Sequence, residues 1–522
     1  MTTPAPLRLF NSLTRQIEDF VPVHPGVAGD ASQPPEARVY TCGPTVYNYP
    51  HIGNMRAYVF ADTLGRVLAF KGYKLRHIIN ITDVGHLTDD ADAGEDKMEK
   101  MAAERAQSIW DIAEHYTDAF KADHAALNCK PPEQWSVATK YVPAMIAFAE
   151  SIADKHCYRL DSGLYFDTST VADYGRLARA VTEDGEGRIE AVDGKRHAAD
   201  FAIWRTTPAG ESRQMEWDSP WGKGAPGWHL ECSVMSRELL GLPFDIHTGG
   251  IDHREIHHPN EIAQNQAITG CGGLDCAEHS GARIWMHNNF LVERSGKMSK
   301  SSGEFLRLQL LIDKGFHPLA YRMLCLQAHY RSELEFSWEG LAAAFVRLKR
   351  LVRLAHDARS QIVTHIDFLF KQGADATEVE RSAIPSLKEI IHPDILELIG
   401  DFEGSISNDL NTSESLIALE RLVPLRHVDP AQKTAAMFAM FKVLGLDGIE
   451  LLSHFVTPSS LRIRPKSATI TEAEIEATLA TRKQARAAKD FARSDALRDQ
   501  LIAQGVEVMD GDPLGWDWRL DI

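Results

Sequence analysis

Four residues that are far apart in the chain could together bind one zinc ion. Cys42 and Cys232 supply sulfur, His257 supplies an imidazole nitrogen and Glu261 a carboxylate oxygen, and zinc accepts all three donor types. His257 and Glu261 are four residues apart, so both project from one face if their segment is helical. Pro259 is compatible with that helix only in its first turn. The alternative is structural: a core cysteine at a strand end and a surface histidine–glutamate pair are both common.

Two short segments could bind nucleotide phosphates. His51-Ile-Gly-Asn54 lies where a predicted strand leads into a predicted helix, and helix N-termini attract anions through their free N–H groups. Residues 295–303 carry Lys297 and Lys300 among hydroxyls and glycines, which is typical of a mobile loop that could close over a triphosphate. The alternatives are a packing glycine at a helix start and a solvated basic loop. The presence of both segments in one chain favours phosphate binding.

The elements that must position these residues follow an α/β pattern. Residues 37–42 predict a strand, a helix follows from about His51, and the β-branched run 75–82 predicts a buried parallel strand. This strand–helix–strand unit favours a doubly wound parallel sheet, Rossmann-like in type, which resumes with a strand at 244–250. The strand ends of such a sheet converge on one rim, so distant ligands can meet there.

The rest of the chain alternates between stretches with helical patterns and stretches with short strand patterns. Residues 90–155 are predicted helical, and short strands near 163–167, 194–196 and 202–205 predict an insertion between two halves of the nucleotide fold. Apolar periodicity predicts helices at 335–360, 385–425 and 430–450, which suits a bundle, and a terminal helical hairpin at 471–504. The predicted division is an N-terminal extension (1–36), the first half of a nucleotide-binding domain (37–159), a connective insertion (160–225), the second half of that domain (226–285), a lysine-loop region (286–334), a helical bundle (335–460) and a small C-terminal module (466–522).

Composition sets wider bounds on location and partners. The chain has 522 residues, 44 % hydrophobic and 25 % charged, which is ordinary for a globular protein. No apolar run approaches the roughly 20 residues that cross a bilayer, and the N-terminus lacks a secretory signal, so we expect a cytoplasmic protein without membrane contact. Seven cysteines, an odd number, do not predict a disulfide framework. Cys325 is predicted to be buried in a helix, and the spacing of Cys271 and Cys276 does not favour a second metal site.

RNA binding must be argued from local features. The net charge of −17 excludes general affinity for nucleic acid, but the stretches 347–353 and 481–486 are basic. Amphipathic surface helices are the alternative interpretation of both stretches. Trp516 and Trp518 could stack on exposed bases or could close a small core.

Longer motifs make the chain similar to a known family. They are Tyr40-Thr-Cys-Gly-Pro-Thr-Val-Tyr-Asn-Tyr-Pro-His-Ile-Gly-Asn54, Asn80-Ile-Thr-Asp-Val84, Gly227-Trp-His-Leu-Glu-Cys-Ser233, His247-Thr-Gly-Gly-Ile-Asp252, His257-His-Pro-Asn-Glu261 and Lys297-Met-Ser-Lys-Ser301. Together they resemble the class I aminoacyl-tRNA synthetases, and specifically the cysteinyl-tRNA synthetase family, from about Tyr40 to the C-terminus. The resemblance implies a terminal module that binds the anticodon.

The resemblance also implies roles for individual residues. It implies zinc ligation, one ion per chain, by Cys42, Cys232, His257 and Glu261. It implies contact with ATP by His51, Gly53, Asn54, Asp252 and Lys300, with His51, Asn54, Lys297 and Lys300 as the catalytic group. Gly43, Thr45, Thr82 and Trp228 would border the bound amino acid. The implied partners are L-cysteine, ATP with Mg²⁺, and tRNA(Cys), bound by a monomer.

Zinc could distinguish cysteine from serine on chemical grounds alone, whatever the family. A wholly organic pocket separates similar small side chains by only about 10²-fold, whereas zinc binds a thiolate far better than a hydroxyl. Four protein ligands usually form a closed site, so the substrate would expand the shell or displace a ligand, for which we expect Glu261. His258, beside a ligand, could support the site or lie on the surface.

Two departures from the family pattern and three other functions accompany this prediction. The nucleotide signature usually ends in a second histidine, where this chain has Asn54, which cannot be cationic. Residues 85–94 predict a local insertion beside the site. The other functions are a ligase that joins cysteine to an amino sugar, a catalytically silent RNA-binding relative, and a structural zinc protein. Pyrophosphate exchange and tRNA charging separate them.

Overall fold

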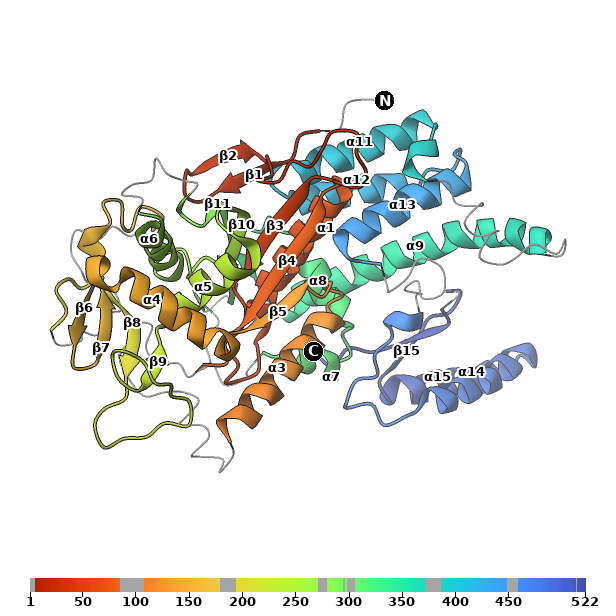
Figure 1. Cartoon of the computed structure of the whole chain (residues 1–522). Coiled ribbons are helices and arrows are strands. Elements are labelled where there is room, and N and C mark those ends of the chain that lie inside the picture. Colours follow the sequence, from red (N-terminus) through yellow and green to blue (C-terminus); the bar gives the residue numbers. More distant parts are fainter. Residues whose placement is uncertain are drawn as a thin grey trace.

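Five parallel strands form the central sheet, in the order β11-β10-β3-β4-β5 (Figure 1). The strands are β3 (Glu36–Thr41), β4 (Lys74–Ile81), β5 (Gln134–Val137), β10 (Phe244–Gly250) and β11 (Ala282–Asn288). The predicted doubly wound sheet is confirmed, because the strand order reverses between β3 and β10. The prediction that 90–155 is wholly helical is wrong at β5. This edge strand has only four residues, too few to show a periodicity of its own.

The coordinates are a computed structural model that describes most of the chain. They describe residues 5–84, 108–178, 194–270, 279–293, 296–297, 306–370, 386–447, 459–512 and 514–522, and only the backbone of 296–297 and 358–370. The predicted insertion at 85–94, the cysteine pair Cys271 and Cys276, and Lys300 lie outside the described residues.

Helices cover both faces of the central sheet (Figure 1). On one face are α1 (Ile52–Phe70) and α3 (Ile109–Ala126), and on the other are α4 (Val142–His156), α5 (Trp228–Leu240) and α6 (His257–Thr269). Alternate residues of β4 serve the two faces: Ile79 packs in the core with α1, and Ile78 packs with α4 and α5. The helix α6 begins at His257, so Pro259 does lie in its first turn.

The segment between the two halves of the sheet forms an antiparallel sheet of its own. Its strands are β6 (Cys157–Leu160), β7 (Gly163–Phe166), β8 (Phe201–Thr206) and β9 (Gly224–Pro226). The strand predicted at 194–196 is wrong, because these residues form a turn. The Arg196 guanidinium lies 4.2 Å from the centre of the Tyr158 ring and 2.9 Å from the Asp167 carboxylate.

Smaller strands lie beside the central sheet. An N-terminal hairpin of β1 (Arg8–Asn11) and β2 (Gln16–Asp19) attaches to β11, where Ser12 N donates to Trp285 O at 2.8 Å. A three-stranded sheet beyond β11 consists of β12 (Leu291–Glu293), β13 (Gly296–Lys297) and β14 (Leu334–Glu335). The described residues include the 3-10 helices η1 (Ala138–Tyr141), η2 (Thr168–Thr170), η4 (Leu387–Glu389) and η5 (Ser459–Leu461).

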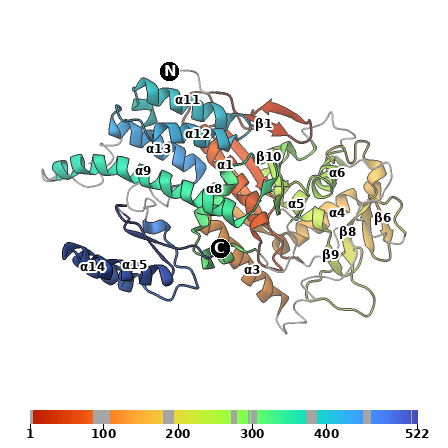
Figure 2. The same cartoon turned by 180° about the vertical axis from the view of Figure 1, so that it is seen from behind.

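The second half of the described chain is mainly helical (Figure 2). It contains α7 (Leu308–Asp313), α8 (Pro318–Leu326), α9 (Trp338–Phe370), α11 (Pro393–Ser407), α12 (Thr412–Leu422) and α13 (Pro430–Leu444). The helix predicted at 385–425 is divided into α11 and α12, because Asp409 and Leu410 adopt positive φ angles of 56° and 54°. Cys325 is buried in α8, as predicted.

The C-terminal residues form a small α/β unit with its own core. It consists of α14 (Glu472–Ala487), α15 (Phe491–Ala503), β15 (Val506–Val508) and β16 (Trp516–Trp518). Trp516 and Trp518 are only 1 % and 3 % exposed and pack in this core. The core interpretation of the two tryptophans is therefore confirmed, and the base-stacking interpretation is wrong. Among the described residues, no helix has the length and apolarity needed to cross a membrane.

Candidate functional site

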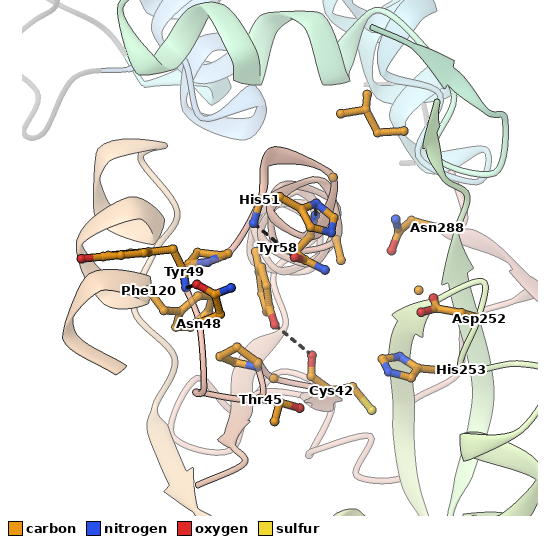
Figure 3. A pocket seen from close by; sticks show the side chains of 18 of the residues that line it. Cys42, Thr45, Asn48, Tyr49, His51, Tyr58, Phe120, Asp252, His253 and Asn288 are labelled. Atoms are coloured by element: carbon orange, nitrogen blue, oxygen red, sulfur yellow. Dashed lines mark hydrogen bonds between the residues drawn. The ribbon is translucent and has the colours of Figure 1, made fainter. Parts of the chain in front are cut away.

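A pocket of about 320 Å³ opens at the carboxyl ends of β3 and β10, where the strand order of the sheet reverses (Figure 3). Parallel sheets bind ligands at this position because adjacent strand ends diverge there. The ends of the two strands are joined by a hydrogen bond of 3.0 Å from Cys42 N to Thr248 O. Seven of the predicted site residues line the pocket: Cys42, Gly43, Thr45, His51, Gly53, Asn54 and Asp252.

The helix α1 presents its N-terminus to this pocket through a capping box. His51 is the N-cap, and its Nδ1 accepts a hydrogen bond from Asn54 N at 3.2 Å. In return, Asn54 Oδ1 accepts from His51 N at 3.3 Å. A neutral His51 therefore carries its ring proton on Nε2. Asn54, which stands where the family signature has a second histidine, has a structural role in holding His51.

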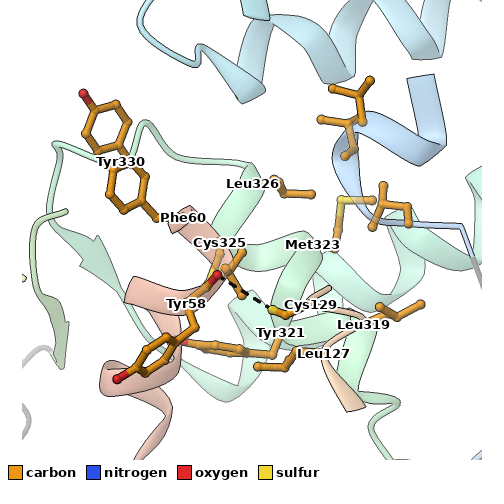
Figure 4. Close-up of a cluster of buried hydrophobic side chains, with 14 of the residues drawn as sticks. Tyr58, Phe60, Leu127, Cys129, Leu319, Tyr321, Met323, Cys325, Leu326 and Tyr330 are labelled. Carbon is orange, nitrogen blue, oxygen red and sulfur yellow. Dashed lines mark hydrogen bonds between the residues drawn. The ribbon is translucent and has the colours of Figure 1, made fainter. Parts of the chain in front are cut away.

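The helix α1 packs against α8 through a cluster of buried side chains (Figure 4). Tyr58 and Phe60 of α1 lie in the same buried cluster as Tyr321 and Cys325 of α8. The Tyr321 hydroxyl donates to Ile52 O at 2.5 Å, in the first turn of α1. These contacts fix the direction in which the first turn of α1 faces the pocket.

The loop after β3 runs against the end of β4. Gly43 N donates to Asn80 Oδ1 at 2.7 Å, and Thr45 forms a parallel bridge with Thr82. Thr82 is buried and donates from its hydroxyl to Glu231 at 3.0 Å, so its side chain is engaged behind the pocket wall. Burial raises the pKa of Glu231 to about 8, so this carboxyl is largely protonated at neutral pH.

The four predicted metal ligands converge beside this pocket. One ligand atom from each of Cys42, Cys232, His257 and Glu261 lies within 4.8 Å of the others, and all four residues are buried. Glu261 Oε1 lies 3.0 Å from His257 Nε2, within ion-pair distance, but no hydrogen bond of good geometry satisfies this buried oxygen. A buried carboxylate oxygen beside two thiols and an imidazole is a donor set that fits zinc.

Further histidines support three of these four residues. His258 Nε2 lies 3.3 Å from Cys42 Sγ, and His247 Nε2 lies 2.9 Å from Glu261 Oε2. His229 Nδ1 lies 2.9 Å from His257 Nδ1. His258 is thus a buried supporting residue and not a surface residue. A second set of four (Cys42, His247, His258 and Glu261) also has its ligand atoms within 4.8 Å of one another.

The four side chains and their burial shift one another's pKa values. Burial raises the pKa of the Cys42 thiol, and a hydrogen bond with Cys42 together with burial raises the pKa of Cys232. Burial alone would lower the pKa of His257, but Cys232 and Glu261 outweigh it and raise that pKa to about 10. Burial opposes ionisation of Glu261, but His247 and His257 outweigh it and lower its pKa to about 2. A bound divalent cation would displace the thiol protons and the extra imidazole proton.

Two other predicted site residues, Trp228 and Lys297, belong to elements outside the central sheet. Trp228 begins α5 and packs against His257, with ring centres 4.6 Å apart, but it does not line the pocket itself. Lys297 lies in β13, paired with Val292 of β12, and only its backbone is described. The pocket also contains His253 and Asn288, which the sequence analysis did not select. The sequence did offer one indication that His253 belongs to the site, because it directly follows Asp252 at the end of a strand motif.

Comparison with known proteins supplies the family. The family described as "tRNA synthetases class I (C) catalytic domain" matches residues 30–346, and "Cysteinyl-tRNA ligase anticodon binding domain" matches residues 471–519. A cysteine–tRNA ligase of Novosphingobium aromaticivorans is 68 % identical over 99 % of this chain and 97 % of its own length. A cysteine–tRNA ligase of Zymomonas mobilis is 50 % identical over 99 % and 98 %.

The chain belongs to the cysteine–tRNA ligase family. Solved class I structures share the fold. A methionyl-tRNA synthetase of Mycobacterium tuberculosis with methionyl-adenylate matches with a TM-score of 0.51 and 14 % identity, over 78 % of this chain and 89 % of its own. A LeuRS–tRNA–LeuAMS complex of Agrobacterium radiobacter matches with a TM-score of 0.54 and 12 % identity, over 94 % and 95 %. The cysteine–tRNA ligase family thus joins this class I catalytic fold to an anticodon-binding module.

Proposed function

We propose that the protein attaches L-cysteine to tRNA(Cys) in two ATP-dependent steps, with a zinc ion that selects the substrate thiol. The observation that carries the proposal is the convergence of Cys42, Cys232, His257 and Glu261 at the wall of the pocket onto which α1 opens. Membership of the cysteine–tRNA ligase family supports the same substrates. The amino acid would enter with its side chain towards the metal ligands and its carboxylate towards α1.

Zinc would supply the selectivity for cysteine over serine. When bound by Cys42, Cys232, His257 and Glu261, it favours a thiolate over the much less acidic hydroxyl of serine. This preference adds to the roughly 10²-fold discrimination that a pocket of similar shape reaches without a metal. The histidines behind the ligands orient them, because His258 and His247 contact Cys42 and Glu261 through their Nε2 atoms.

The chain's own residues would carry out adenylation by positioning and charge stabilisation. His51 directs Nε2–H to the ATP phosphates because its Nδ1 is occupied by Asn54 N. A Cβ at Gly53 would come within 2.9 Å of the His51 ring, so the glycine leaves room for this imidazole beside the phosphates. Asp252 is the partner for the ribose hydroxyls, on the β10 side of the pocket. Lys297 and Lys300 stabilise the charge that develops on the leaving pyrophosphate, with Mg²⁺ carried in by ATP.

The amino acid would be enclosed by the loop after β3 and the start of α5. Gly43 and Thr45 line the pocket, and Thr82 and Trp228 support its wall next to Glu231 and His257. The carboxylate of cysteine attacks the α-phosphorus, pyrophosphate leaves, and the terminal ribose hydroxyl of the tRNA then takes the acyl group. No enzyme nucleophile is needed for this sequence.

The tRNA would be held by residues 335–460 and 466–522. Basic residues at 347–353 are paired with acidic side chains of the chain itself: Arg347 and Arg350 with Glu420, Lys349 with Asp517, and Arg353 with Asp512. Exposed basic residues of α14, α15 and the turn between them are therefore the better phosphate contacts: Lys483, Lys489, Arg493 and Arg498. We further propose a cytoplasmic monomer.

Two assays in sequence test the proposal. Cysteine-dependent ATP–pyrophosphate exchange tests adenylation, and charging of tRNA(Cys) then separates a synthetase from a cysteine:amino-sugar ligase. Exchange with serine in place of cysteine measures the selectivity. A purified protein that performs neither reaction would reject the proposal.

The metal assignment has its own test in Cys232→Ser. This change should remove bound zinc and abolish cysteine-dependent exchange, because it replaces a soft sulfur ligand with a hydroxyl. Cys157→Ser is the matched control, since Cys157 lies in β6 of the antiparallel sheet and is not one of the four ligands. Metal analysis and exchange are measured on both variants. Normal exchange by metal-free Cys232→Ser protein would reject the assigned site.

A further inference from the structure

His253 lies in the loop between β10 and α6 and lines the pocket beside Asp252. Its imidazole points into the pocket, between Cys42 and Asp252 (Figure 3). The backbone of this residue is fixed on both sides, because His253 N donates to Gly250 O at 3.0 Å and His253 O accepts from His258 N at 2.8 Å. The ring is therefore presented to the pocket by a well-defined turn.

The ring of His253 is closely packed but lacks a hydrogen-bond partner. Its centre lies 5.2 Å from that of His257 and 6.1 Å from that of Trp228. A side chain at Gly249 would come within 2.8 Å of Nδ1, so the ring can lie there only because β10 ends in glycine. Nδ1 is buried and unsatisfied, and neither ring nitrogen is hydrogen-bonded to another residue in the described part of the chain.

The lack of a partner sets His253 apart from the histidines that surround the metal ligands. His229 is paired with His257, His247 with Glu261, and His258 with both Cys42 and His287. These histidines have structural partners that account for their burial. A pocket-lining imidazole without such a partner is instead suited to a ligand that is absent from the structure.

The position of the ring indicates which part of the ligand it would meet. If the cysteine sulfur lies at the metal ligands and the ATP ribose at Asp252, the cysteine carboxylate and the α-phosphate lie between them, next to His253. On the α1 side of the pocket, Asn54 supplies a neutral amide, and its Oδ1 is already engaged by His51 N. A further hydrogen-bond donor would therefore stabilise the negative charge at the α-phosphate, and His253 lies where it could donate.

We propose that His253 is a further catalytic residue of the adenylation step, and this rests on the function proposed above. A neutral His253 donates a hydrogen bond from Nε2 to the non-bridging oxygens of the α-phosphate. The new bond forms between a carboxylate oxygen and the α-phosphorus, the bond to pyrophosphate breaks, and the electron pair leaves with pyrophosphate. No proton is transferred, so the imidazole acts only by stabilising negative charge.

Replacement of His253 by leucine and by glutamine tests this role. The loss of one such donor costs about 10²-fold or more in kcat, so His253→Leu should slow cysteine-dependent exchange by about 10²-fold. The KM values for cysteine and ATP and the zinc content should stay close to those of the wild type. His253→Gln, which keeps an N–H donor at a similar reach, should recover a large part of the lost rate. His24→Leu, at an exposed position in the N-terminal segment, is the matched control.

Three results would overturn the inference. They are a wild-type exchange rate in His253→Leu, equal impairment of the leucine and glutamine variants, and loss of zinc from His253→Leu, which would assign the ring to the metal site. Transfer from preformed cysteinyl-adenylate to tRNA should be unchanged in both variants. The absence of exchange in the wild type would instead reject the proposed function, so the two failures are distinguishable.

Discussion

A methyl group added at Gly43 should force apart the carboxyl ends of β3 and β4 in the central sheet. The new Cβ would lie 1.5 Å from Asn80 O and 2.5 Å from Asn80 C, and both are backbone atoms. Ordinary contacts of a Cβ atom begin at 3.4 Å, so the ends of β3 and β4 would have to separate by more than an ångström. A side-chain rotation cannot relieve this clash, because the obstacle belongs to a strand in the middle of the sheet.

The expected cost of Gly43→Ala is therefore at the upper end for overpacking, about 3 kcal/mol in the free energy of unfolding. The hydrogen bond of 2.7 Å from Gly43 N to Asn80 Oδ1 would be lost in addition. Because Cys42 and Thr45 flank this position in the pocket wall, cysteine-dependent exchange should fall with stability.

Gly404→Ala is the matched control for this prediction. Gly404 lies inside α11, and a Cβ there would meet nothing within 4 Å. Alanine should stabilise the helix by up to about 1 kcal/mol and leave exchange unchanged. Denaturant unfolding and pyrophosphate exchange are measured for both variants. A Gly43→Ala protein with the wild-type unfolding midpoint and exchange rate would refute the steric reasoning.

Two further predictions concern the leaving group and the support of α1. Lys300→Ala should slow adenylate formation far more than it weakens cysteine binding, because the lysine acts on charge that develops only in the transition state; an unchanged single-turnover rate would disprove that role. Arg322→Met should cost about 3 kcal/mol, because it removes one of the two guanidinium groups that pair with the buried carboxylate of Asp62, at 2.5 Å, and leaves Arg66 at 2.7 Å as the other. Denaturant unfolding measures this loss, and Arg421→Met, at the largely exposed ion pair with Asp401, is the control. Equal midpoints for the two variants would contradict the argument.

Local sequence patterns were sufficient for three of the five strands of the central sheet, whereas the four candidate metal ligands were assigned through the family resemblance. The strand predicted at 75–82 is β4 (Lys74–Ile81), and the strand predicted at 244–250 has the same bounds in the structure. Both are short apolar runs that are buried on two faces, so their composition alone is distinctive. Residues 134–137 escaped prediction because an edge strand of four residues carries no such pattern. The turn at 194–196 escaped because the contacts of Arg196 are to Tyr158 and Asp167, which are 38 and 29 residues away in the chain.

By itself, the sequence determined the type of sheet, the family resemblance and the residues that could ligate a metal, because periodicity and motif spacing are local properties of the chain. Only the tertiary structure decided how those residues meet. It brought four ligand atoms within 4.8 Å of one another, enclosed Trp516 and Trp518 in a core, and paired the basic residues of 347–353 with acidic ones. It also turned His253 into the pocket without a partner. Distances, burial and ion pairing depend on which segments pack together, and residues far apart in the chain supply those contacts.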